Sequence, residues 1–322
     1  MGPHRRAPAP LEVALVRLGL LGLALLLWFD PSCAPAARGW RALLQWAAPG
    51  LELDSSGADS DSASAVRLLF AAGLSALLAA TFWLANGALL LAGRAGLLER
   101  WRIAVSQPPP PAELLRECVA DALLGQLAVR PLLLFAAYPA FASAGMRAEA
   151  AALPSCRELL LQIFVCMQVD DALFYWIHRA LHHYPQLYKR IHKQHHRFGH
   201  TVGLAVEYAH PAEDMLNAFA TMAGPFLLGC HMAVVWLYPT LKLAQSIDAH
   251  SGYDLPFPLS IWSAVDVMDC APAHSFHHSR NTGMYGGYFV FWDRLCGTDA
   301  SYRTHLLQGQ STGGKGKRSS ED

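Results

Sequence analysis

The sequence predicts an all-α protein: a polytopic bundle of membrane helices with a cytosolic helical cap that holds a histidine-rich di-metal site. Three observations support this fold class. Hydrophobic residues make up 53% of the 322-residue chain and charged residues only 16%, which is too apolar for an ordinary soluble domain. Uncharged runs long enough to enter a bilayer recur along the chain. Eight histidines in its C-terminal half form three patterns, HxxxH, HxxHH and HxxHH.

The charge balance excludes several classes of partner. Lysine plus arginine number 25, and so do aspartate plus glutamate. A chain without excess charge is not suited to nucleic acid or to purely electrostatic attachment to anionic surfaces. The seven cysteines form no CxxC pair, which is typical of reduced thiols and not of a disulfide framework. The expected partners are therefore the membrane and an apolar molecule, with no nucleic acid.

Residues 1–105 are predicted to be an N-terminal membrane-anchor region. A basic N-terminus precedes the apolar run Leu18–Phe29, which we interpret as an uncleaved anchor or a re-entrant segment. Residues 51–64 are acidic and rich in serine, and they predict a solvated loop. Leu68–Gly93 carries no charge and is long enough to cross the hydrocarbon core. It is the clearest transmembrane helix in the sequence.

The segment SQPPPPA, residues 106–112, predicts a stiff proline-rich linker because it cannot continue a helix. The catalytic domain is expected to follow, at residues 113–305, and the polar tail 306–322 is expected to be disordered.

Three apolar blocks lie within the expected catalytic domain. Pro131–Met146 is the first, and the shorter Leu159–Val169 runs into the first histidine cluster. Met215–Leu241 contains no Asp, Glu, Lys or Arg, but it is interrupted by Pro225, Gly229 and Pro239. This third block therefore predicts a broken or hairpin-like helical pair instead of one straight span.

The spacing of the first two clusters predicts metal ligands. His178 and His182 lie four residues apart, on one face of a helix, so both imidazoles can reach one ion. His195 and His196 both lie within a turn of His192, but about 100° apart around a helix. The second cluster is therefore expected to straddle two ions.

The third cluster, His274, His277 and His278, repeats the second spacing far along the chain. Folding must bring it back to the others, so that three helical faces enclose one bimetal site. Imidazole suits iron, zinc, copper or nickel. The clusters contain no carboxylate, unlike the Glu-x-x-His motifs of soluble di-iron bundles. All eight histidines are predicted to be metal ligands and catalytic residues of a different class of site.

A single HxxxH pair is weak evidence, because such pairs are often surface or packing histidines. Three patterns interleaved with membrane spans favour a shared metal site. His183 lies off the face that His178 and His182 share, and its role stays open. The other isolated histidines are interpreted as solvated or packing residues: His4, His200, His231 and His305.

Several segments around the clusters resemble the fatty acid hydroxylase and sterol desaturase superfamily. The match covers roughly residues 170–299 and includes LYKRIHKQHH, EYAHPAED, DAHSGYDLP and YGGYFVFWDRLCGTD. The AHP and HSGYD segments are most similar to the sterol carbon-4 methyl oxidase and cholesterol 25-hydroxylase-like branch. Members of the family use more than eight histidines, which implies His250 as a ninth ligand and leaves His210 open.

The resemblance implies a membrane-bound, non-haem di-iron oxygenase that oxidises a lipid C–H bond with dioxygen. No pyridine-nucleotide fingerprint is present, so electrons are expected from an external b-type cytochrome or an NAD(P)H-dependent reductase. Lys189, Arg190 and Lys193 offer a docking face for such a donor, although topology and phospholipid contact explain them equally well. The positive-inside rule places the clusters on the cytosolic face of a multi-pass protein, expected in the endoplasmic reticulum membrane.

The expected substrate is a sterol, oxidised at a carbon-4 methyl group or hydroxylated elsewhere. Two alternatives remain open: a fatty acyl or sphingolipid hydroxylase or desaturase, and a non-catalytic membrane metal-binding or scaffold protein. Acidic residues near the clusters are interpreted as contacts to a substrate hydroxyl or as structural hydrogen-bond partners: Glu207, Asp248 and Asp254. Aromatic residues are interpreted as the substrate mouth or as an interfacial belt: Tyr175, Trp176 and Trp292.

Overall fold

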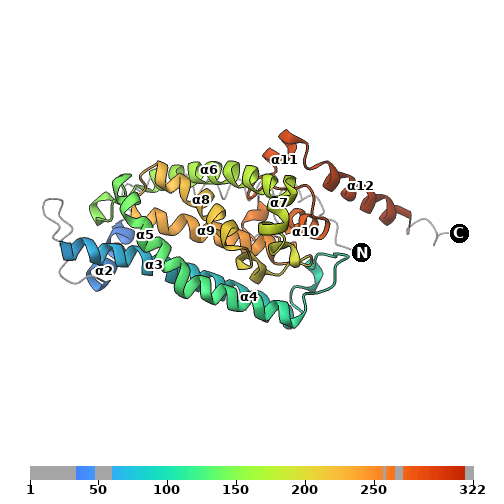
Figure 1. Cartoon of the computed structure of the whole chain (residues 1–322), viewed down its shortest axis with the longest axis horizontal. Coiled ribbons are helices and arrows are strands. Elements are labelled where there is room, and N and C mark those ends of the chain that lie inside the picture. The colour runs from blue at the N-terminus through green and yellow to red at the C-terminus, as the bar shows by residue number, and fades with distance from the viewer. Residues whose placement is uncertain (1–33, 48–59, 257–258, 265–270, 316–322) are drawn as a thin grey trace.

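The computed structural model describes residues 34–47, 60–256, 259–264 and 271–315, and the regular structure in these ranges is helical. The only β-type pairing among them is one isolated bridge between Arg102 and Tyr253. The bundle is elongated, with α2 (Ala34–Ala47) at one end and α7 (Pro185–Leu187) and α10 (Ala271–Arg280) toward the other (Figure 1). The predicted all-α class is confirmed.

Three helical stretches are long and apolar enough to cross a membrane. Helix α3 (Ser60–Arg94) contains the first, and α6 (Cys156–His183) is the third. The second joins α4 (Ala112–Leu124) to α5 (Arg130–Ser143) through one π-helical turn. The predicted span Leu68–Gly93 is confirmed as part of α3. The N-terminal run Leu18–Phe29 lies outside the described residues.

The third apolar block forms a helical pair, as the sequence predicts. Helix α8 (Pro211–Leu227) ends before α9 (Met232–His250) begins. Two prolines, Pro225 and Pro239, lie inside these helices, and the break falls at Gly229 instead. Gly229 has a φ of 55°, and a Cβ there would lie 2.7 Å from the carbonyl oxygen of Ala144. Glycine is the residue that tolerates both restrictions.

Two helices extend into polar segments for which the sequence predicts no regular structure. The rest of these segments, residues 51–59 and 316–322, lies outside the described residues. Helix α3 begins at Ser60, inside the stretch 51–64 that predicts a loop. Serine and aspartate are favourable at a helix N-terminus, so the long apolar helix extends into them. Helix α12 (Ala300–Lys315) continues past residue 305, where the sequence predicts disorder. Leu306 and Leu307 are good helix formers and continue the helix. The remaining short helix is α11 (Phe291–Cys296).

Helix α6 carries the first histidine pair and begins at a capping box. The Ser155 hydroxyl accepts from the Glu158 backbone N–H at 3.3 Å, and the Glu158 carboxylate accepts from the Ser155 N–H at 2.8 Å. Along its length α6 packs against α8, while α3 packs against α5 and α9. Phe70, Leu74 and Tyr238 are fully buried in the core between these helices. This packing fixes the far end of α6, where His178 and His182 lie.

The contact between α6 and α8 depends on Gly224. A Cβ at this position would lie 2.7 Å from the Cα of Cys166 and 3.1 Å from its Sγ. We expect Gly224→Ala to destabilise the protein by roughly 1–3 kcal/mol, because two backbones must separate. Gly87→Ala in α3 is the matched control, since nothing lies within 4 Å of its Cβ position. Thermal unfolding in detergent measures both, and equal melting temperatures for the two variants would contradict this expectation.

Candidate metal centre

Nine histidines from distant parts of the chain meet at one end of the bundle. His178 and His182 lie in the last turns of α6, and His250 is the last residue of α9. The second cluster follows α7, and the third lies on α10 (Figure 1). Seven of the nine are buried, whereas His182 and His274 are half-buried.

The nine side chains divide into two groups, in each of which one ligand atom per residue lies within 4.8 Å of the others. The five-histidine group consists of His178, His182, His192, His196 and His277. The four-histidine group consists of His195, His250, His274 and His278. The second and third clusters contribute to both groups, in the straddling arrangement that their spacing predicts.

Within each group the Nε2 atoms point at one another. In the five-histidine group, Nε2 of His196 lies 3.1 Å from that of His182, 2.9 Å from that of His192 and 3.2 Å from that of His277. In the four-histidine group, the Nε2 atoms of His250 and His274 are 2.9 Å apart. A metal–imidazole bond of about 2.1 Å places ligands at right angles about 3.0 Å apart. The spacing therefore suits six-coordinate geometry.

Main-chain carbonyls determine which nitrogen carries the proton. Nδ1 of His178 lies 3.0 Å from the Tyr285 oxygen. The corresponding distances to a carbonyl oxygen are 3.3 Å for His195, 2.8 Å for His250, 2.7 Å for His277 and 3.0 Å for His278. A carbonyl oxygen only accepts, so each of these Nδ1 atoms donates and each Nε2 presents a lone pair.

Converging lone pairs repel one another unless a cation lies between them. The residues present therefore fit a pair of metal ions: the two groups consist of buried or half-buried imidazoles, and carbonyl oxygens already hold five of them in the ligating tautomer.

Burial keeps these imidazoles neutral. It lowers the pKa of His195 to about 4. Burial, together with the neighbouring His195 ring, lowers the pKa of His250 to about 3. At neutral pH both rings are unprotonated and available to a metal ion.

The second cluster departs from the expected α-helix. His192 ends a π-helical turn, Tyr188–His192, and His195 begins a 3₁₀ turn, His195–Arg197. Irregular turns of this kind direct neighbouring side chains apart. His195 and His196 enter different groups, as His277 and His278 do from the α-helix α10, so the split does not depend on the irregular turns.

Glu213, at the start of α8, contacts His192 from outside the clusters. Its Oε1 lies 2.9 Å from His192 Nδ1, and both side chains are almost completely buried. Burial raises the pKa of Glu213 and lowers the pKa of His192. Both shifts favour neutral groups. The contact between Nδ1 and Oε1 is close but is not aligned as a hydrogen bond, and His192 Nδ1 has no other hydrogen-bond partner among the described residues.

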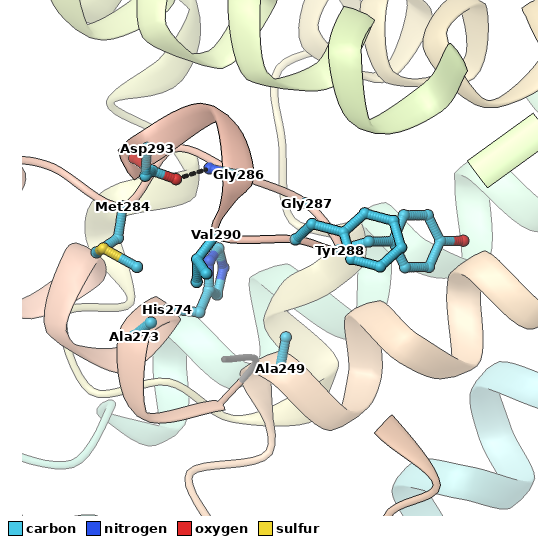
Figure 2. Close-up of a pocket in the computed structure, with 10 residues that line it drawn as sticks. Ala249, Ala273, His274, Met284, Gly286, Gly287, Tyr288, Val290 and Asp293 are labelled. Atoms are coloured by element: carbon cyan, nitrogen blue, oxygen red, sulfur yellow. Dashed lines mark hydrogen bonds between the residues drawn. The ribbon is translucent and has the colours of Figure 1, made fainter. Parts of the chain in front are cut away.

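The loop between α10 and α11 covers the four-histidine group. Asp293 accepts from the backbone N–H groups of Tyr285 and Gly286 at 2.9 and 2.8 Å, and Asp171 accepts from that of Tyr288 at 2.7 Å. Figure 2 shows this loop over the His274 ring, with Asp293 bonded to Gly286. A cavity of about 20 Å³ lies between them, with room for one molecule the size of water.

Several singled-out residues lie outside both groups. His183 is exposed. His210 caps α8, its Nδ1 accepting from the Ala212 N–H at 3.1 Å. His231 caps α9 in the same way. His200 and His305 also belong to neither group.

The acidic and aromatic candidates have mainly structural contacts. Glu207 bonds to Arg130 and Gln126, each at 2.7 Å, and Asp248 accepts from Ser260 at 2.7 Å. The backbone N–H of Asp254 donates to the Trp101 oxygen at 2.8 Å. Tyr175 is fully buried and stacks on Trp292. Trp176 is half exposed.

Sequence reasoning missed three buried carboxylates: Asp171, Glu213 and Asp293. Each lies within the part of the chain that carries the family resemblance. The only other sign of a role is that a carboxylate is unusual in so apolar a chain. Such residues are rarely buried without a partner.

The comparisons with known proteins agree with this geometry. The family described as fatty acid hydroxylase matches residues 163–298, which include all nine histidines. Methylsterol monooxygenase 2-2 of Arabidopsis thaliana is 36% identical over 225 residues, covering 69% of this chain and 82% of its own. Very-long-chain aldehyde decarbonylase GL1-11 of Oryza sativa subsp. japonica is 35% identical with the same coverage. Methylsterol monooxygenase 1 of Danio rerio is 40% identical over 46% of this chain and 50% of its own.

No solved structure matches the chain. The family match falls on the segments that form the two histidine groups. The Arabidopsis methylsterol monooxygenase aligns over most of its own length. The chain is therefore a member of the fatty acid hydroxylase family.

Proposed function

We propose that this protein is a membrane-bound di-iron monooxygenase that oxidises a lipid C–H bond with dioxygen. The observation that carries the proposal is the convergence of nine histidine side chains in two groups beside apolar helices. Each group offers enough nitrogen ligands for one ion of octahedral preference, and neither contains the thiolates typical of a structural zinc site. When bound, two iron ions would supply the reduction of dioxygen and the oxidising power to attack a C–H bond.

The chain itself would supply ligand geometry and a dry setting. Main-chain carbonyls orient five of the rings, and Asp171 and Asp293 hold the loop that covers His274. The small cavity beside His274 matches a molecule the size of dioxygen or water, and not a lipid ring system. The lipid therefore reaches the site from the apolar helices, and the catalytic unit comprises residues 113–305.

A sterol is the favoured substrate, with oxidation at a carbon-4 methyl group. The names of the Arabidopsis and Danio relatives support this choice. An acyl chain is the second candidate, because two of the plant relatives with the same coverage are named as very-long-chain aldehyde decarbonylases.

The remaining components of the proposal concern location and electron supply. The protein would lie in the endoplasmic reticulum membrane with its histidines facing the cytosol. A b-type cytochrome or an NAD(P)H-dependent reductase would deliver electrons. Lys189, Arg190 and Lys193 are exposed beside the second cluster and suit an acidic donor.

The proposal predicts two irons per chain and a sterol product. Elemental analysis after expression in iron-rich medium should give a metal-to-protein ratio near two. A ratio near one, or full activity with zinc alone, would overturn the di-iron assignment. Purified protein that binds metal but consumes no dioxygen with reductant and lipid would instead indicate a scaffold.

Substrate class is tested in host cells that lack their own methylsterol oxidase, with lipids measured by mass spectrometry. Loss of the accumulated 4-methylsterols on expression is the expected result, and a His277→Ala variant is the control. Persistent 4-methylsterols together with new hydroxylated acyl lipids would favour the second candidate.

A further inference from the structure

Glu213 differs from every other group that supports a histidine in the centre. Five of the nine histidines direct Nδ1 at a main-chain carbonyl. His192 alone, among the described residues, has a carboxylate within 4 Å of that atom. Glu213 Oε1 lies 2.9 Å from it, and the two side chains are 4% and 2% exposed.

Glu213 and the five-histidine group contact opposite nitrogens of His192. Nε2 of His192 lies 2.9 Å from Nε2 of His196, inside the group. An imidazole that presents its Nε2 lone pair must carry its proton on Nδ1. His192 Nδ1 has no aligned hydrogen-bond partner among the described residues, and Glu213 Oε1, 2.9 Å away, is the carboxylate oxygen within reach of that proton. His192 also ends a π-helical turn, a rare element that is frequent at functional sites.

We propose that Glu213 is a positioning residue for one of the two metal ions: its carboxyl oxygen fixes the tautomer and ring orientation of His192 and thereby selectively strengthens metal binding by the five-histidine group. The inference rests on the proposed metal site. It assigns a role to the first turn of α8, which lies outside the three clusters. It also implies that loss of Glu213 weakens the binding of one metal ion and not of the other.

The test is metal retention by the full-length protein in detergent after loading with iron, measured by elemental analysis across a chelator series. Glu213→Leu removes the acceptor and should release one iron of the two at about 10–100-fold lower chelator concentration, while the second iron dissociates as in the wild type. Glu213→Gln keeps an acceptor oxygen and should restore retention to within a few fold. Asp214→Asn, at the next position, is the matched control and should behave as the wild type.

Glu213→Ala tests the same contact without added bulk, in case the leucine variant does not insert in the membrane. Wild-type retention in Glu213→Leu and Glu213→Ala would overturn the inference, as would equal losses of both irons. Equal weakening in the glutamine and alanine variants would also overturn it, because the hydrogen-bond acceptor would then not be responsible. A wild-type protein that never retains two irons would instead refute the proposed metal site itself.

Discussion

His195→Ala and His277→Ala are each expected to reduce turnover by more than about a hundredfold, because each variant loses a metal ligand and not merely a supporting contact. The two replacements affect different groups. His277→Ala leaves four histidines in its group, whereas His195→Ala leaves three. The iron-to-protein ratio should therefore fall further for His195→Ala, toward one.

His183→Ala is the matched control for these two variants. His183 neighbours His182 in the chain but is exposed and belongs to neither group. Membrane insertion, iron content and sterol turnover are measured together for all three variants. Wild-type turnover in His195→Ala or His277→Ala, with insertion intact, would show that the replaced histidine is not a required ligand.

Asp293→Ala is expected to destabilise the protein by roughly 3 kcal/mol, because it leaves two buried N–H groups without acceptors. The carboxylate accepts from the Tyr285 and Gly286 N–H groups and from the Thr298 hydroxyl at 2.6 Å. A melting temperature lowered by about 5 °C is the corresponding signal in a thermal scan. Iron content should also fall, since the Tyr285 oxygen accepts from His178.

Asp293→Asn separates the hydrogen bonds from the bulk of the side chain. The amide retains one acceptor oxygen, so its melting temperature should lie between those of the wild type and the alanine variant. An alanine variant that melts with the wild type and retains its iron would show that the loop over His274 is held by other contacts.

The arrangement of ligands could be predicted from spacing wherever local geometry decides it. The HxxxH pair lies on one face of α6, and the HxxHH clusters divide between two groups as the offset of neighbouring side chains requires. Membership of His250 could be inferred only from the family resemblance, because an isolated histidine at a helix end has no spacing signal.

Contacts between distant segments could not be predicted in this way. The contact between Glu213 and His192 depends on the approach of α8 to the second cluster. The hydrogen bond from the Tyr288 N–H to Asp171 likewise joins residues far apart in the chain. Which interruption ends a helix in the third apolar block is a tertiary outcome too, since Pro225 and Pro239 lie inside helices and the break falls at Gly229. Pattern reasoning identified the histidines that meet in the two groups, but not the contacts that hold them in place.

The use of main-chain carbonyls to orient the rings has an evolutionary consequence. Every residue type carries a carbonyl, so the side chains at Phe198, Tyr208, Ser246 and Tyr285 can be replaced, as far as packing permits, without removing the acceptors that orient the histidines. Glu213 differs from these positions, because its side chain itself makes the contact with His192. The side chains that contact lipid can therefore change during evolution while the two histidine groups stay the same. Relatives of similar identity that are named for a sterol reaction and for an aldehyde reaction are the expected products of that divergence.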